Sequence, residues 1–222
     1  MKYRSSRWFY VSGQLGVSEQ ASDVEPYGNN IAVDSEFPGA FDNGDGTVGS
    51  IGFGYIFNQN YRLEGRVGKR DGSFSDSKLG SGSRDGEEYI VNGKLKSATF
   101  TVEAFYDFAN DTAFTPYVKV GLGIADNSYS ARLGGAGVAA YDAYDGSVDG
   151  YYDAYADDES SEFSWNAGFG ANYALSQNVS LYGEYQFATF GEVKTGQDSF
   201  TDGFKIDDAA AHEMMIGIRI KL

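Results

Sequence analysis

Apolar and polar residues alternate with a period of two in eight segments spread along the whole chain. In one of them, Val118, Val120 and Leu122 alternate with Lys119 and Gly121. Successive side chains of a β-strand point to opposite faces of a sheet, so this period is typical of strands with one apolar and one polar face. The eight segments span residues 8–18, 47–57, 61–70, 96–108, 115–129, 162–175, 179–190 and 210–222.

The connections between these segments are alternately long and short. The short ones are 58–60, 109–114 and 176–178, and the long ones are about 19–46, 71–93, 130–161 and 191–209. If neighbouring strands are antiparallel, all the short turns lie at one end of the sheet and all the long loops lie at the other. An even number of strands with this asymmetry is typical of an outer-membrane barrel. We therefore predict an all-β fold: one domain over 1–222, an eight-stranded antiparallel transmembrane β-barrel with short periplasmic turns and four long extracellular loops.

Composition excludes several other classes of protein. The 222 residues include no Cys, which excludes disulfides, thiolate metal sites and cysteine nucleophiles, and a single histidine excludes a multi-histidine zinc site. A net charge of −15 argues against nucleic acid as a partner. No apolar run reaches the length of a membrane helix, although that criterion does not detect barrels whose strands alternate.

The polar face of the strands carries charges of both signs, whereas the opposite face is nearly free of charge. Charged side chains that are buried must be paired, so we expect them to form a salt-bridge network that fills a narrow barrel interior. A gate that exchanges ion-pair partners is the alternative interpretation. The predicted interior residues are Arg62, Glu64, Arg66, Glu103, Lys119, Glu184, Glu213, Arg219 and Lys221. Aromatic residues near the strand ends of the apolar face predict two interfacial girdles: Phe57, Tyr61, Tyr106, Phe108 and Tyr173 at one, and Phe163, Trp165 and Phe187 at the other.

With these features the chain resembles the small outer-membrane barrels of the OmpA, OmpX and opacity-protein type. The resemblance rests on eight amphipathic strands, on glycine-rich alternation such as that of residues 117–123, and on a closing strand that ends in Ile216, Ile218, Ile220 and Leu222. It implies a location in the outer membrane of a Gram-negative bacterium, with outer-membrane lipid and lipopolysaccharide as partners.

The long connections hold most of the acidic charge. Counted over 19–46, 71–93, 126–162 and 191–208, they contain 26 acidic and five basic residues, a net charge of −21. The third also repeats Tyr-Asp pairs between residues 139 and 159, a mixture of rings and carboxylates of the kind that contact surfaces use.

Three interpretations of these loops remain open: a solvated surface, a site for divalent cations, and a contact surface for a protein, a glycan or a second copy of the chain. Hard oxygen ligands suit Ca²⁺ or Mg²⁺, although no segment has full EF-hand spacing. The candidate ligands are Asp142, Asp145, Asp149, Asp153, Asp157, Asp158 and Glu159, with Asp42 and Asp45 in the first loop. We expect no other cofactor.

His212 is the one residue that suggests catalysis, because some outer-membrane barrels hydrolyse lipid A or peptides with a histidine. Its segment places it on the apolar face, and no serine is adjacent to it. We therefore expect a packing role for His212 and no enzymatic activity. A lipid A-modifying enzyme is the weaker alternative.

We expect a structural, surface-contact or adhesion role that the acidic loops carry out. The alternative is an OmpW-like conduit for small hydrophobic molecules, which needs an apolar lumen at the loop end. Four aromatic residues on the polar face give that alternative some support: Tyr10, Phe105, Tyr117 and Tyr182.

Overall fold

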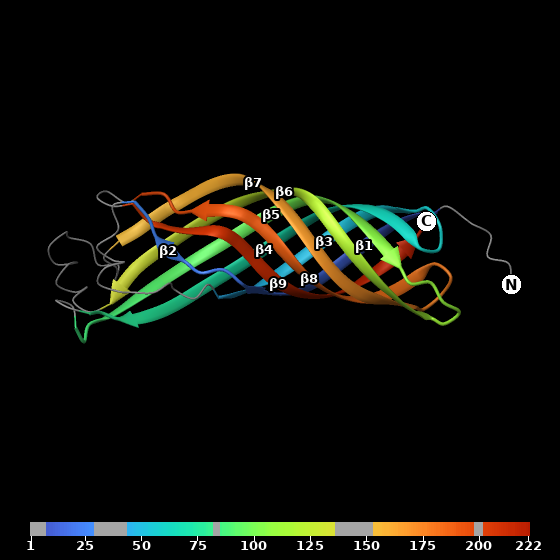
Figure 1. Ribbon diagram of the computed structural model, residues 1–222, viewed down its shortest axis with the longest axis horizontal. Coiled ribbons are helices and arrows are strands. Elements are labelled where there is room, and N and C mark those ends of the chain that lie inside the picture. Colours follow the sequence, from blue (N-terminus) through green and yellow to red (C-terminus); the bar gives the residue numbers. More distant parts are fainter. Residues whose placement is uncertain (1–7, 29–43, 82–84, 136–152, 198–201) are drawn as a thin grey trace.

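The computed structural model describes residues 8–28, 44–81, 85–135, 153–197 and 202–222. They form one antiparallel sheet that closes into a long barrel (Figure 1). Its strands are β1 (Trp8–Gln20), β2 (Glu25–Pro26), β3 (Asp45–Ile56), β4 (Tyr61–Leu79), β5 (Glu88–Asp107), β6 (Phe114–Gly135), β7 (Asp153–Ala174), β8 (Val179–Lys194) and β9 (Phe204–Lys221). Within these described ranges, no helix is long and apolar enough to cross a bilayer.

Eight long strands make the barrel, in the order in which they occur in the chain. β1 pairs with β3 on one side and with β9 on the other, and this second pairing closes the ring. The two-residue strand β2 lies outside this ring of eight and adds to β9 through Glu25 and Pro26. The predicted eight-stranded antiparallel barrel is therefore confirmed.

The two ends of the barrel differ as predicted. Three short turns, at 57–60, 108–113 and 175–178, lie at the end where β1 starts and β9 finishes (Figure 1). We call this the turn end, and we call the opposite end, from which the longer connections emerge, the loop end. The four longer connections follow β1, β4, β6 and β8.

The strands continue much further towards the loop end than the predicted segments do. β4 runs to Leu79, β5 starts at Glu88 and β6 runs to Gly135, so the predicted loop 71–93 shrinks to residues 80–87. The predicted loops 130–161 and 191–209 lose residues to strands in the same way, because β6 runs to Gly135, β7 starts at Asp153, β8 runs to Lys194 and β9 starts at Phe204.

An inversion of polarity explains why these boundaries were wrong. In the part of β5 nearer the turn end, Phe100 and Val102 face outward and Glu103 faces the lumen; in the part nearer the loop end, Val91 and Leu95 are buried inside. The strand keeps its period of two, but its apolar residues move from the outer face to the inner face between residues 95 and 100. A strand that is predicted from one continuous apolar face therefore ends at that point.

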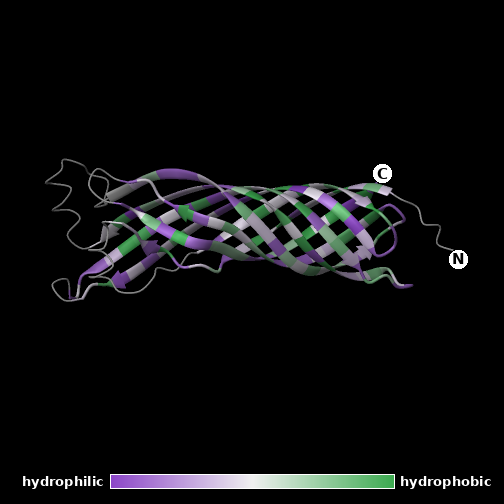
Figure 2. Ribbon diagram, turned by 45° about the horizontal axis from the view of Figure 1, so that its top comes forward, coloured by the Kyte–Doolittle hydropathy of each residue, from purple (hydrophilic) through white to green (hydrophobic). Residues whose placement is uncertain are grey.

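The outer wall carries an apolar belt over its turn-end half. Ile216, for example, is 76% exposed and Leu15 is 71% exposed. On β6 the belt ends between Ile124 and Asp126, and the outward residues that follow are polar (Figure 2). A strand needs about 9–11 residues to cross a bilayer, and β6 has 22. We therefore place the membrane around the belt, so that the loop-end half projects beyond it.

Candidate functional site

The lumen of the turn-end half is filled by charged side chains from several strands. Eight of the nine predicted interior residues are buried there, and Lys221 is half-buried near the mouth. Two charged residues outside that prediction, Arg70 and Asp107, are buried with them. Among the described residues the lumen therefore holds five buried cations (Arg62, Arg66, Arg70, Lys119 and Arg219) and five buried carboxylates (Glu64, Glu103, Asp107, Glu184 and Glu213).

Glu103 of β5 lies at the centre of this network. Its carboxylate accepts hydrogen bonds from Arg66 Nε at 3.1 Å and from Lys119 Nζ at 3.2 Å. The Lys119 amine also lies 2.7 Å from Glu184 Oε1, and Arg66 pairs with Glu64. Each charge of this central cluster thus has a partner of opposite sign, which is the arrangement that offsets the cost of removing charges from water.

At the turn end, arginines lie against inward-facing aromatic rings. The Arg62 guanidinium lies 3.6 Å from the centroid of Phe105 and forms an ion pair with Asp107 at 3.0 Å. Arg219 lies over the rings of Tyr10 and Tyr182, at 5.1 and 5.4 Å. These contacts stabilise cations whose desolvation is otherwise costly.

The placement of these aromatic residues corrects the sequence analysis. Tyr10, Phe105, Tyr117 and Tyr182 support a conduit only if they line the loop end, but they lie at the turn end, where Tyr10 pairs in register with Lys221 and Tyr117 with Asp107. Small residues opposite them make room for the rings: a Cβ atom on Gly54 would lie 2.2 Å from the Tyr10 ring.

A further ion pair marks the top of the charged network. Arg70 of β4 donates to both carboxylate oxygens of Glu213 on β9, and its guanidinium lies 4.5 Å from the Phe190 ring. The sequence analysis missed Arg70, although its parity along β4 could have revealed it: Arg62, Arg66 and Arg70 are all at even positions of one strand.

Above Arg70 the lumen is filled by an apolar core, as in a soluble barrel. This core contains Val24, Phe74, Tyr89, Val91, Leu95, Ala125, Tyr129, Ala131, Leu133, Tyr155, Ala188, Phe190, Val193, Phe204, Ile206, Ala209 and Ala211. Burial raises the pKa of the Tyr129 phenol. Between the core and the charged network lies a cavity of only about 10 Å³, about the space of one water molecule. Buried side chains therefore occupy both halves of the described lumen.

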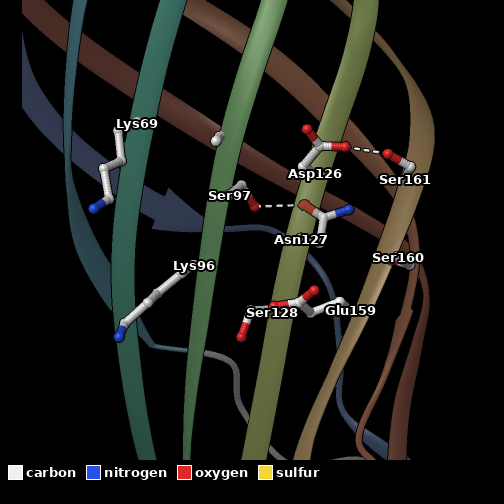
Figure 3. A pocket seen from close by; sticks show the side chains of 10 residues that line it. Lys69, Lys96, Ser97, Asp126, Asn127, Ser128, Glu159, Ser160 and Ser161 are labelled. Atoms are coloured by element: carbon white, nitrogen blue, oxygen red, sulfur yellow. Dashed lines mark hydrogen bonds between the residues drawn. The ribbon is translucent and has the colours of Figure 1, made fainter.

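The outer wall has a groove of about 550 Å³ just beyond the apolar belt, over β4–β7 (Figure 3). Two registered rows of outward residues form it. One row is Lys69, Ala98, Asp126 and Ser161, and the next is Lys96, Ser128 and Glu159. In Figure 3 the two lysines extend on one side, while Asp126 and Ser161, which are joined by a hydrogen bond, lie on the other. The groove thus has a basic wall on β4 and β5 and an acidic wall on β6 and β7.

The predicted cation ligands are not brought together by the residues that the structure describes. Asp157, Asp158 and Glu159 belong to strand β7 rather than to a loop, and Asp153 is its first residue. Across the described ranges, no three acidic or histidine side chains could hold a metal ion in common. Asp142, Asp145 and Asp149 lie outside the described residues, as does Asp42, so the prediction of a loop cation site stays a prediction.

His212 lies on the outer wall of β9 among aromatic residues. Its Nδ1 atom is 2.7 Å from the Tyr185 hydroxyl, and its ring lies 5.3 Å from that of Phe187. Phe187 in turn lies 5.6 Å from Trp165. This cluster belongs to the lipid-facing surface, which is the packing environment that the sequence predicts for this histidine.

A comparison with known families agrees with this architecture. The model of the outer membrane protein beta-barrel domain family matches residues 2–208. The chain belongs to this family. Members of this outer-membrane barrel family reside in the outer membrane of Gram-negative bacteria, which confirms the predicted location.

Individual relatives agree with the family assignment. The chain is 26% identical to the outer membrane protein PagN of Salmonella typhimurium, over 94% of this chain and 87% of that protein. Among solved structures, OprG of Pseudomonas aeruginosa is similar with a TM-score of 0.55 at 13% identity, covering 99% of this chain and 97% of its own. The outer membrane protease OmpT of Escherichia coli is similar with a TM-score of 0.53 at 10% identity, covering 100% and 99%. At these identities both structures show the fold alone.

Proposed function

We propose that this outer-membrane barrel is a non-enzymatic surface protein whose projecting half holds its acidic loops for contact with another surface, in a structural or adhesive role. The observation that carries the proposal is the apolar core inside the loop-end half. Residues such as Leu95, Phe190 and Phe204 pack there away from water, beyond the belt that faces lipid. A core of this kind supports a rigid extension, and a rigid extension presents loops at a distance from the membrane.

The composition of the loops supports a contact role. Acidic groups alternate with tyrosines, which supply large contact area with a polar hydroxyl at low conformational cost. A net charge of −21 over the loops and their flanks favours partners that are basic or that bring divalent cations. Ca²⁺ held by the Asp-rich third loop, and association of two copies through it, are the finer parts of this proposal.

The closed lumen argues against the rival conduit. A small hydrophobic molecule that enters from the loop end meets packed side chains such as Phe74 and Tyr155, and below them the buried pair of Arg70 and Glu213.

Replacement of the third loop tests the proposed function. A variant in which residues 137–151 are replaced by a short Gly-Ser linker keeps all nine strands and loses most of the Tyr-Asp pairs. We expect adherence of cells that display this variant to fall to the level of cells without the barrel, while the heat-induced shift in gel mobility stays as in the parent. A matched variant carries a Gly-Ser insertion in the 108–113 turn. Full adherence by the loop variant would contradict the proposal.

A further inference from the structure

The charge of the barrel is distributed unevenly around the outer rim of the apolar belt. Lys69, Lys94 and Lys96 gather on the outer faces of β4 and β5, all exposed, in a chain of net charge −15. Exposed carboxylates occupy the loop-end half of other strands, among them Glu19, Asp45, Glu192 and Asp208. At this height β4 and β5 therefore carry three exposed lysines and one exposed carboxylate, Asp71.

These lysines lie directly beyond the edge of the belt. Lys69 is two residues after Val67 on β4, and Val67 pairs in register with Phe100 of β5. Lys96 is four residues from Phe100, on the same face, with the small Ala98 between them. Amines at this height lie at the level of lipid headgroups.

Both amines are available to a ligand. Asp71, the cross-strand neighbour of Lys96, is the nearest carboxylate in register, but no ion pair joins Lys69 or Lys96 to any carboxylate within the described ranges. Asp126 and Glu159 lie on the opposite wall of the groove (Figure 3). An anion is therefore attracted to the β4–β5 side and repelled from the β6–β7 side.

The basic groove continues into an apolar one. A depression of about 1010 Å³ on the outer wall shares Lys69 and Ala98 with the groove and extends towards the turn end. It is lined by Leu15, Ile51, Val67 and other apolar residues. Outward-facing Gly13 deepens it, because the nearest atom to a Cβ built at this position is 4.0 Å away.

We propose that this surface is a binding site for a phosphorylated glycolipid of the outer leaflet, of the lipid A class. A phosphate group lies between the amines of Lys69 and Lys96, and an acyl chain occupies the depression along β1, β3 and β4. The continuity of a cationic and an apolar surface at Lys69 selects a ligand that joins a phosphate to a hydrocarbon chain. A free phosphate has no hydrocarbon chain to occupy the apolar depression.

Titration of the detergent-solubilised full chain with diphosphorylated lipid A, followed by native mass spectrometry, tests the proposal. Removal of two amines near an anionic lipid costs about 1 kcal/mol each, so we expect Lys69→Gln/Lys96→Gln to weaken binding about thirty-fold. The matched control is Lys194→Gln/Lys205→Gln, which removes the same charge from β8 and β9 and should bind like the parent. Hydrogen bonding to Asp207 raises the pKa of Lys205, so the control removes a charge that is present at neutral pH.

Further measurements distinguish the two halves of the site. Dephosphorylated lipid A should bind the parent and the lysine variant equally, and inorganic phosphate should not displace the lipid. Gly13→Leu, which fills the apolar depression, should weaken binding of both lipids. Equal affinity of the parent and the lysine variant for diphosphorylated lipid A would overturn the proposal, as would displacement by inorganic phosphate. The heat-induced gel shift shows that each variant is folded.

Discussion

Arg70 of β4 and Glu213 of β9 form an ion pair across the lumen, although β3 and β1 separate their strands in the sheet. Gln186 of β8 donates a further hydrogen bond to the same carboxylate. Glu213 is fully buried, and the Phe190 ring centroid lies 4.5 Å from the guanidinium. The pair therefore ties opposite walls of the barrel together at the level where the charged lumen gives way to the apolar core.

Removal of Arg70 alone should be strongly destabilising. Arg70→Met leaves Glu213 buried without its cation, and a buried charge that loses its partner costs about 3–5 kcal/mol. We expect this loss in the free energy of unfolding, measured by urea denaturation of the barrel folded in lipid vesicles. The double variant Arg70→Met/Glu213→Met should recover much of the loss, because it buries no unpaired charge. A double variant as unstable as the single one would show that Arg70 acts through packing rather than through the pair.

The sequence was sufficient to predict the barrel, because apolar residues that face lipid must alternate with residues that face the lumen along each strand in the membrane. The same rule located interior residues such as Glu103 and Lys119, which share one parity with the glycines of their strands. It could not show that Val91 and Leu95 point inward. Beyond the membrane the outer face of the barrel meets water, so polar residues are favoured on the outer face and apolar residues on the inner face. Nor could it place Tyr10 and Tyr182 at the correct end. The parity of a residue shows whether its side chain faces the lumen, but only the register of the strands shows its level along the barrel axis.

Damage to the apolar core at the loop end should destabilise that half of the barrel and leave the membrane-embedded half intact. Phe204 is fully buried and lies 5.4 Å from the Tyr155 ring. Phe204→Ala should cost about 3–5 kcal/mol locally, and we expect limited proteolysis to cut the loop-end parts of β7–β9 faster. The matched control is Phe114→Ala, an exposed residue at the turn end, which should leave the rate of cutting unchanged. Equal rates in both variants would show that the core does not hold the extension together.

Two closed levels of the lumen should prevent transport. Liposomes that contain the barrel should take up small polar and small hydrophobic solutes no faster than protein-free liposomes. Glu103→Gln/Lys119→Gln weakens the charged level, but we expect no uptake because Phe190 and its neighbours still fill the lumen above. Uptake above background by the unmodified barrel would support the conduit instead of the surface-contact role.

His212 should matter for packing and not for hydrolysis. His212→Ala removes one hydrogen bond to Tyr185 and should lower the free energy of unfolding by about 0.5–1.5 kcal/mol. Hydrolysis of lipid A or of ester substrates should be the same for the barrel and for this variant. Tyr185→Phe removes the same hydrogen bond while keeping the ring, so a similar loss of stability is expected. Hydrolytic activity that disappears only in His212→Ala would establish an enzyme.

Calcium should change the association of the detergent-solubilised barrel. In chelator, loops with a net charge near −21 repel one another, and we expect the native mass of a monomer. Millimolar Ca²⁺ supplies a cation that carboxylates of two copies can share, so the mass should increase. Exchange of Asp142, Asp145 and Asp149 for Asn should abolish the increase, whereas exchange of Asp157 and Asp158, which lie in β7, should reduce it less because a strand fixes their separation. A monomer at both conditions would remove calcium and self-association from the proposed function, and would leave contact with a different surface as the role of the loops.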